Sequence, residues 1–270
     1  MLDGKTALVT GSSLGIGYAV AEKPASLGCN LVMNGIEPAD EIGAKADALA
    51  ETHGVKAVYA ACDVGDGPAL DAVMQRTLDD FGGIDIVVNN AVTRVFGNIE
   101  DTDPAAWEHA IDVNLNSAFR TIHHAMPGMK RNGWGRIVNM SSIYGQIGAA
   151  GRASYVTAKT ALIGLTRAVA LEVAEHENIT CNAVAPGAVR ATHADNSIRA
   201  IMDEHGLSED DAVKRFLAGK NPSGRFAETA SVAELCAFLC GARSLEALPP
   251  AATLRGIERV DALSEFIRLP

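Results

Sequence analysis

The chain lacks an excess of positive charge, a long apolar run and cysteines spaced as metal ligands. Its 33 acidic residues outnumber 23 basic ones, giving a formal net charge of -10, which argues against nucleic acid or an anionic membrane as a partner. No apolar run approaches the ~18 residues of a membrane span, and no signal peptide precedes the first expected strand. The five cysteines are scattered. We therefore expect a cytoplasmic protein with no bound metal.

What the sequence contains instead is a regular alternation of short apolar runs and helical patterns. The expected strands are 6–10, 30–34, 56–60, 84–88, 135–140 and 179–184. The expected helices are 15–27, 38–53, 66–81, 104–130, 153–176 and 228–241. Strands buried on both faces and joined by helical crossovers predict an α/β fold with a doubly wound, Rossmann-type parallel sheet of six or seven strands and helices on both faces. We expect one domain over 1–243, including a long substrate loop at 188–226.

A glycine-rich turn, Thr10 to Gly17, directly follows the first expected strand. Glycines let the backbone approach a pyrophosphate, and the following helix offers unpaired N–H groups and a favourable dipole. An ordinary glycine loop would show the same pattern, so this turn predicts a dinucleotide site only together with the motifs downstream.

Tyr155 and Lys159 are four residues apart and therefore share one face of an expected helix. A phenol is a poor proton donor or acceptor at neutral pH, and a nearby ammonium favours the phenolate form. The spacing is common by chance, but Ser142 upstream and the glycine turn make it informative. Other polar motifs also follow expected strands, at the edge where ligands bind in such sheets; they are Asp63, Asn89 to Ala91, Ser141 to Ser142, and Pro186 to Gly187.

Together these motifs, with Asn114, resemble the short-chain dehydrogenase/reductase family over about residues 1–242. Within it, residues 34–35, 134–139, 178–183 and 218–223 are most similar to D-3-hydroxybutyrate dehydrogenases. The resemblance implies a catalytic set of Asn114, Ser142, Tyr155 and Lys159. Tyr155 would exchange the substrate's hydroxyl proton, Ser142 would bind the same oxygen, Lys159 would hold the nicotinamide ribose, and Asn114 would anchor a proton-relaying water.

The resemblance also implies which residues contact the cofactor. They are Gly11, Ser13, Leu14, Gly15, Ile16, Gly17, Gly35, Asp63, Val64, Asn90, Tyr155, Lys159, Pro186, Gly187 and Val189. The segment Leu31 to Ile36, which ends the second strand, carries neither the carboxylate that binds the ribose of NAD nor a basic residue for the phosphate of NADP. Because no lysine or arginine is placed to pair with that phosphate, and because of the resemblance, we predict NAD.

The expected substrate contacts follow from the resemblance as well. They are Arg94, Ser142, Tyr144, Arg152, Tyr155 and His193. The resembled enzymes have glutamine, histidine and lysine where this chain has Arg94, Tyr144 and Arg152. Arginine can bind a carboxylate through two parallel hydrogen bonds, although a solvated surface charge is an equally good interpretation of Arg94 and Arg152. The leading hypothesis is an NAD-dependent dehydrogenase of a small hydroxy acid, similar to 3-hydroxybutyrate, assembled as a tetramer or dimer. The alternatives are a sugar, a cyclic alcohol or a 3-oxoacyl thioester as substrate, or a non-enzymatic dinucleotide-binding protein.

Three features depart from the family pattern. Val92 stands where the family has glycine and could crowd the nicotinamide ribose. Pro24 lies inside the first expected helix, so we expect a distortion there. Residues 244–270 lack the closing strand of the family, which predicts an atypical C-terminal tail.

Overall fold

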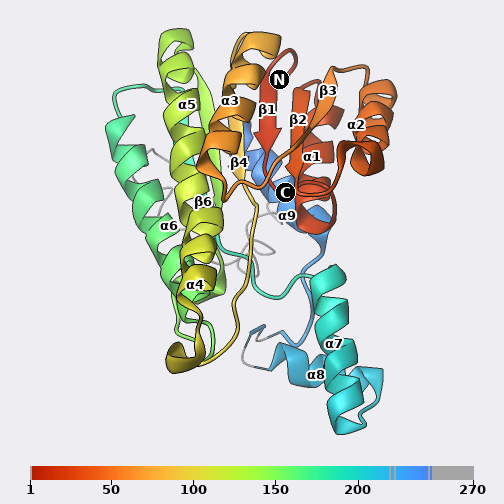
Figure 1. Cartoon of the computed structure of the whole chain (residues 1–270). Coiled ribbons are helices and arrows are strands. Elements are labelled where there is room, and N and C mark those ends of the chain that lie inside the picture. Colours follow the sequence, from red (N-terminus) through yellow and green to blue (C-terminus); the bar gives the residue numbers. More distant parts are fainter. Residues whose placement is uncertain (1, 219, 222, 243, 245–270) are drawn as a thin grey trace.

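Six parallel strands form one sheet in the part of the chain that the computed structural model describes, residues 2–218, 220–221, 223–242 and 244 (Figure 1). The strands are β1 (Thr6–Val9), β2 (Asn30–Gly35), β3 (Ala57–Ala61), β4 (Ile86–Asn89), β5 (Gly135–Met140) and β6 (Ile179–Val184). Their order is β3-β2-β1-β4-β5-β6. The order reverses between β1 and β4, and this switch point is where a doubly wound sheet opens a crevice at its carboxyl edge.

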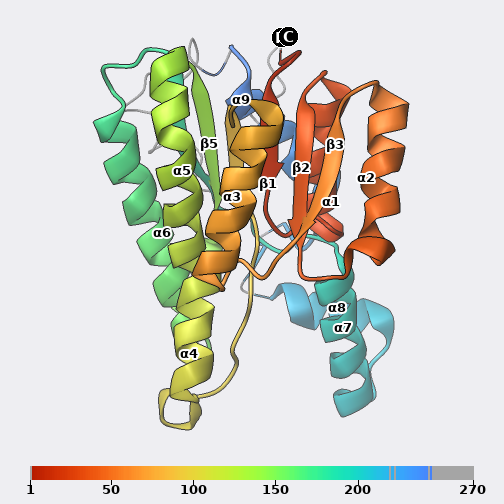
Figure 2. The same ribbon diagram turned by 45° about the horizontal axis from the view of Figure 1, so that its top comes forward.

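Helices cover both faces of the sheet, as expected. Two core clusters explain this arrangement, because successive strand residues point to opposite faces: Val9 of β1 packs in one cluster and its neighbour Leu8 in the other. The first cluster includes residues of α1 (Gly15–Ser26), α2 (Ala39–His53) and α9 (Thr229–Cys240). The second includes residues of α3 (Gly67–Phe81), α5 (Ser117–Asn132) and α6 (Ala153–Glu172) (Figure 2). The expected doubly wound fold is therefore present.

The expected helix 104–130 is wrong in one important respect. It consists of α4 (Pro104–Ile111), a π-helical turn at Asp112–Asn116, and α5, which continues to Asn132. A π-helical turn contains more residues than an α-helical one, and such turns are frequent at functional sites. Sequence periodicity did not reveal the interruption. Similarly, α6 ends at Glu172 and not at 176.

The distortion expected at Pro24 does not divide the helix. Helix α1 runs without a break through Pro24 to Ser26, and the backbone N–H of Leu27 bonds to the carbonyl of Pro24 at 3.0 Å. Pro24 lacks the N–H that would bond one turn back, and the helix ends two residues later, at Ser26. The expectations for residues 245–270, including the loss of a closing strand, lie outside the described residues.

The segment between β6 and α9 makes an excursion beyond the carboxyl edge of the sheet. It contains α7 (Thr192–His205) and α8 (Glu209–Leu217), which project away from the sheet in Figure 1. Its two ends are joined, because the N–H of Arg190 bonds to the carbonyl of Ala227 and the N–H of Ala227 bonds to that of Ala188. None of the helices in the described ranges is long and apolar enough to cross a membrane.

Candidate active site

The glycine turn after β1 is fastened to the end of β4. The side-chain amide of Asn90 donates to the carbonyls of Thr10 and Gly11, at 3.0 and 2.8 Å. Gly11 has a φ of +60°, and a Cβ there would lie 2.7 Å from the Cα of Ala91. A Cβ at Gly17 would collide with the carbonyl oxygen of Gly11. Glycine is therefore required for this close packing, which leaves the N-terminus of α1 open toward the crevice.

A groove runs from this turn to the ends of β2 and β3. Among the predicted cofactor contacts, Gly11, Ser13, Leu14, Gly15, Ile16, Gly17, Gly35, Asp63, Val64 and Asn90 line it. The other predicted contacts, Tyr155, Lys159, Pro186, Gly187 and Val189, line an adjoining cavity. The two spaces adjoin, because five residues line both: Ile16, Asn90, Val92, Ala191 and His193. The structure thus gathers all the predicted cofactor contacts along one path.

One carboxylate in the groove was missed by the sequence analysis. Glu37 lines the groove at the end of β2, one residue beyond the segment searched. The hydroxyl of Tyr59 donates to the carbonyl oxygen of Glu37 at 2.9 Å and to the Glu37 carboxylate at 3.4 Å. Burial and the Glu37 charge raise the pKa of Tyr59 to about 12, so the phenol remains a donor. The spacing signal was available, because the acid that binds the ribose follows the glycine motif by about 20 residues.

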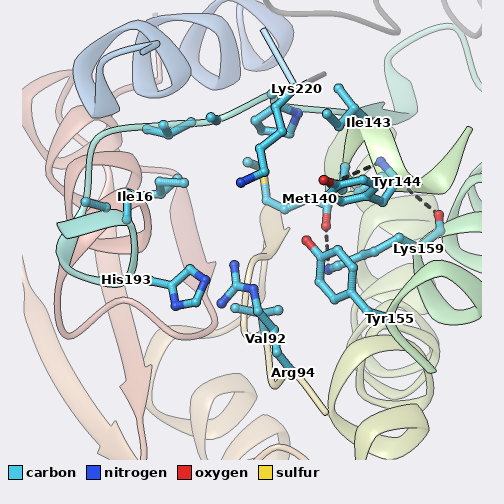
Figure 3. A pocket seen from close by; sticks show the side chains of 18 of the residues that line it. Ile16, Val92, Arg94, Met140, Ile143, Tyr144, Tyr155, Lys159, His193 and Lys220 are labelled. Atoms are coloured by element: carbon cyan, nitrogen blue, oxygen red, sulfur yellow. Dashed lines mark hydrogen bonds between the residues drawn. The ribbon is translucent and has the colours of Figure 1, made fainter. Parts of the chain in front are cut away.

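Three of the predicted catalytic residues, Ser142, Tyr155 and Lys159, meet where the cavity reaches the carboxyl end of β5 and the first turns of α6. The ammonium of Lys159 donates to the carbonyl of Met140 at 2.7 Å and lies 5.8 Å from the ring centroid of Tyr155. The hydroxyl of Ser142 accepts the N–H of Tyr144 at 3.2 Å. Figure 3 shows the hydroxyl of Tyr155 turned into the cavity beside the end of Lys159. A proton donor, a cation and a hydroxyl therefore share one small space.

Lys159 is almost completely buried, with 2% of its surface exposed. Loss of hydration, and secondarily the positive charge of Arg94, lower its pKa to about 7. Burial away from water disfavours the charged form of an amine, which is why the pKa falls. The Lys159 amine therefore exchanges its proton near neutral pH in the protein without cofactor.

Asn114 lies buried in the π-helical turn and does not line the cavity. Its side-chain NH₂ donates to the carbonyls of Thr93 and Ala110, at 2.9 and 2.8 Å. These two acceptors fix the orientation of the amide. Its oxygen is buried without a hydrogen-bond partner among the described residues. A buried acceptor of this kind is normally satisfied by an ordered water, so the geometry is compatible with the predicted water anchor.

All six predicted substrate contacts line the cavity, and a further cationic side chain joins them. Arg94 places its guanidinium 5.5 Å from the ring centroid of Tyr155. The guanidinium of Arg152 lies 5.4 Å from the ring of Tyr144. Lys220 also lines the cavity, although the sequence analysis did not select it. Arg94 and Arg152 are both partly buried, and both face the cavity.

Val92 lies at the junction of groove and cavity, with 39% of its surface exposed. Within the described residues every positive φ belongs to a glycine. The Val92 backbone therefore accepts a β-branched side chain without strain. The expected crowding of the nicotinamide ribose stays a prediction.

Comparison with known proteins agrees with this geometry. Residues 5–202 match the family described as short chain dehydrogenase. The chain belongs to the short-chain dehydrogenase family. It is 38% identical over 239 residues to a D-beta-hydroxybutyrate dehydrogenase of Cupriavidus necator, covering 88% of this chain and 92% of that protein. It is 35% identical over 242 residues to a 3-oxoacyl-(acyl-carrier-protein) reductase of Aquifex aeolicus, covering 88% and 91%.

The solved structures to which the chain is similar include short-chain dehydrogenases with other substrates. The L-sorbose reductase of Gluconobacter frateurii, complexed with NADPH and L-sorbose, has a TM-score of 0.84 and 30% identity, covering 90% of this chain and 92% of that one. Short-chain dehydrogenases bind a nicotinamide cofactor. The groove fits one, because the tight turn that Gly11 and Gly17 allow presents the first N–H groups of α1, which are suited to a pyrophosphate, to the groove.

Proposed function

We propose that this oxidoreductase uses NAD to oxidise a small hydroxy acid, or to reduce the matching keto acid, through Ser142, Tyr155 and Lys159. The observation that carries the proposal is the position of these residues in a cavity that is lined by arginine and adjoins a groove suited to a dinucleotide. Bound in the groove, the nicotinamide supplies a hydride acceptor or donor. The chain then needs to position the substrate and to move one proton.

Each catalytic side chain has a defined part in that proton movement. Tyr155, as phenolate, takes the hydroxyl proton of the substrate, and Ser142 donates a hydrogen bond to the same oxygen and orients it. Lys159, when charged, stabilises negative charge on the substrate and on the Tyr155 oxygen during the proton transfer, and it would hold the nicotinamide ribose. The unpaired oxygen of Asn114 holds a water near Thr93, through which Lys159 exchanges protons with solvent.

Glu37 supports NAD over NADP. Its carboxylate lines the groove beside Gly35, where a Cβ would lie 2.6 Å from the carboxylate oxygen. A carboxylate there accepts hydrogen bonds from the ribose hydroxyls and repels a 2′-phosphate. The L-sorbose reductase is complexed with NADPH, so nucleotide preference differs within the similar structures. We further propose a homo-oligomer with one catalytic domain over residues 1–243.

The hydroxy acid preference follows from the charge of the cavity. Arg94 lies next to Tyr155, where a carboxylate near the reacting carbon can pair with it. The similarity to a D-beta-hydroxybutyrate dehydrogenase supports the same class. A neutral sugar or cyclic alcohol would leave this charge unpaired.

The substitution Tyr155→Phe tests the mechanism. It removes only the hydroxyl, so we expect turnover to fall by a factor of about 1,000 or more while nucleotide affinity changes less than about three-fold. Oxidation rates and NADH fluorescence titration measure the two quantities separately. Tyr18→Phe is a matched control, because Tyr18 lies on α1 and lines neither groove nor cavity. Turnover by Tyr155→Phe at the wild-type rate would contradict the mechanism.

A further inference from the structure

The cavity beside Tyr155 is strongly basic, although the whole chain is acidic. Its described lining includes five side chains that are or can become cationic and no carboxylate; the five are Arg94, Arg152, Lys159, His193 and Lys220. The net charge of the chain is -10. A pocket of one sign within a protein of the other sign concentrates ligands of opposite charge.

The cationic groups enter the cavity from two sides. Arg94 comes from the loop after β4 and lies beside Tyr155. Lys220 follows α8, near the C-terminal end of the segment between β6 and α9. Figure 3 shows its side chain pointing into the cavity, toward Arg94. Arg152 stands just before α6, close enough to Lys220 for its charge to lower the pKa of that amine. The cavity therefore has one cation, Arg94, beside Tyr155 and a second, Lys220, that reaches it from another wall, with Arg152 near Lys220.

Backbone contacts hold the segments of Arg152 and Lys220 in place. Gly97 forms a bridge with Arg152, and the N–H of Gly97 bonds to the carbonyl of Gly151 at 3.2 Å. Next to Lys220, the Asn221 side chain accepts the N–H of Ala188 at 2.8 Å and donates to the carbonyl of Ala188 at 3.1 Å. These contacts fix the backbone from which both side chains reach the cavity.

Bringing these charges together without an acid is unfavourable for the free protein. Loss of hydration and the Arg152 charge lower the pKa of Lys220 to about 8. Partial desolvation, then the charges of Arg94, Arg152 and Lys220, lower the pKa of His193. Within the described residues no ion pair joins Arg94, Arg152 or Lys220 to a carboxylate. An anionic ligand relieves this repulsion, and two carboxylates relieve more of it than a single carboxylate does.

We propose that the substrate is a small hydroxy dicarboxylate, with one carboxylate bound by Arg94 and the second bound between Arg152 and Lys220. The inference rests on the proposed function, since the alcohol between the two carboxylates must reach Tyr155. Its carbon loses a hydride to oxidised nicotinamide, and its hydroxyl loses a proton to Tyr155, which gives a keto dicarboxylate and reduced nicotinamide. Lys220 and Arg152 are specificity-determining residues in this arrangement.

A matched pair of substrates tests the second carboxylate. The compounds 3-hydroxyglutarate and 3-hydroxybutyrate differ only by a carboxylate on the methyl carbon of the latter. We expect kcat/KM with NAD to be about ten-fold or more higher for the diacid, because two charged hydrogen-bonded contacts are gained. Binding of the unreactive pair glutarate and butyrate to the NADH complex, measured by calorimetry, gives the same comparison without turnover. We expect glutarate to bind about ten-fold or more tightly.

Substitutions in the described chain locate the effect. Lys220→Gln should lower the diacid-to-monoacid ratio of kcat/KM about ten-fold, and the glutarate-to-butyrate ratio of affinity by a similar factor. The single substitution Arg152→Gln should lower both ratios more than Lys220→Gln does. Lys214→Gln is the matched control, because Lys214 is exposed on α8 and pairs with Asp211 at 2.9 Å. It should leave both ratios unchanged.

The outcomes separate the inference from the proposed function. Equal or weaker binding of glutarate than butyrate would overturn the dicarboxylate site, and so would a ratio unaffected by Lys220→Gln. Efficient oxidation of 3-hydroxybutyrate without preference for the diacid would leave the proposed function intact and overturn this inference alone. Tight glutarate binding that depends on Lys220, without oxidation of either acid, would support the anion site and refute the proposed reaction.

Discussion

Replacing Lys159 by methionine should change how the stability of the protein depends on pH. Burial lowers the pKa of Lys159 from 10.5 to about 7 in the folded protein. Between these values the unfolded chain holds a proton that the folded chain has released. Unfolding therefore takes up a proton, and the free energy of unfolding rises with pH across this window by up to about 1.4 kcal/mol per unit.

The size of the effect follows from the same two pKa values. Below pH 7 both states are protonated, and burying the ammonium costs the fold at most about 5 kcal/mol. At pH 9.5 most of that cost is gone, which leaves a difference of about 3 kcal/mol between pH 6.5 and 9.5. Lys159→Met removes this term. It also leaves the Met140 carbonyl without its donor, a loss of about 1–3 kcal/mol that does not depend on pH.

Urea unfolding followed by circular dichroism, without nucleotide, measures both proteins at the two pH values. The stability of Lys159→Met relative to the wild type should be about 3 kcal/mol more favourable at pH 6.5 than at pH 9.5. Titrations elsewhere, including that of Lys220, occur in both proteins and cancel in the comparison. A relative stability that is the same at both pH values would refute the burial argument for Lys159.

Two further substitutions test other parts of the site. Glu37→Gln removes the carboxylate at the end of β2, so the kcat/KM preference for NAD over NADP should fall by about ten-fold; Glu41→Gln, exposed on α2, should leave it unchanged, and an unchanged preference in Glu37→Gln would refute the role of this acid. Asn114→Ala leaves two carbonyls without the side-chain donor, so the free energy of unfolding should fall by about 1–3 kcal/mol and turnover should fall with it. A fully active and equally stable Asn114→Ala protein would contradict both the buried hydrogen bonds and the water anchor.

The sheet was predictable because its strands are buried on both faces and each is followed by a motif at the carboxyl edge. Because Gly11, Asn90 and Ser142 each follow a strand at this edge, the sequence predicted that they lie close together. The π-helical turn around Asn114 was not predictable, since apolar periodicity in the sequence did not signal the extra residue in one turn.

Two residues of the site were missed for different reasons. Glu37 has the expected spacing of about 20 residues from the glycine turn, but it lies one residue past the segment Leu31 to Ile36, which ends the expected second strand. Lys220 belongs to the stretch 218–223 that resembles hydroxybutyrate dehydrogenases, but neither spacing nor periodicity indicated that its side chain reaches the cavity from the long segment between β6 and α9. Its place at the cavity depends on tertiary contacts of Asn221 with Ala188, which connect residues far apart in the sequence. Propensity and periodicity describe local structure and cannot supply such a contact.

The central claim is that this short-chain dehydrogenase uses NAD to oxidise a small hydroxy acid at Tyr155. Formation of reduced nicotinamide, with NAD and then NADP, against 3-hydroxybutyrate, 3-hydroxyglutarate and uncharged secondary alcohols of similar size tests it most directly. The account predicts turnover of the acids with NAD, at least about ten-fold slower turnover with NADP, and little with the uncharged alcohols. Preferential turnover of the uncharged alcohols, or a preference for NADP, would contradict it.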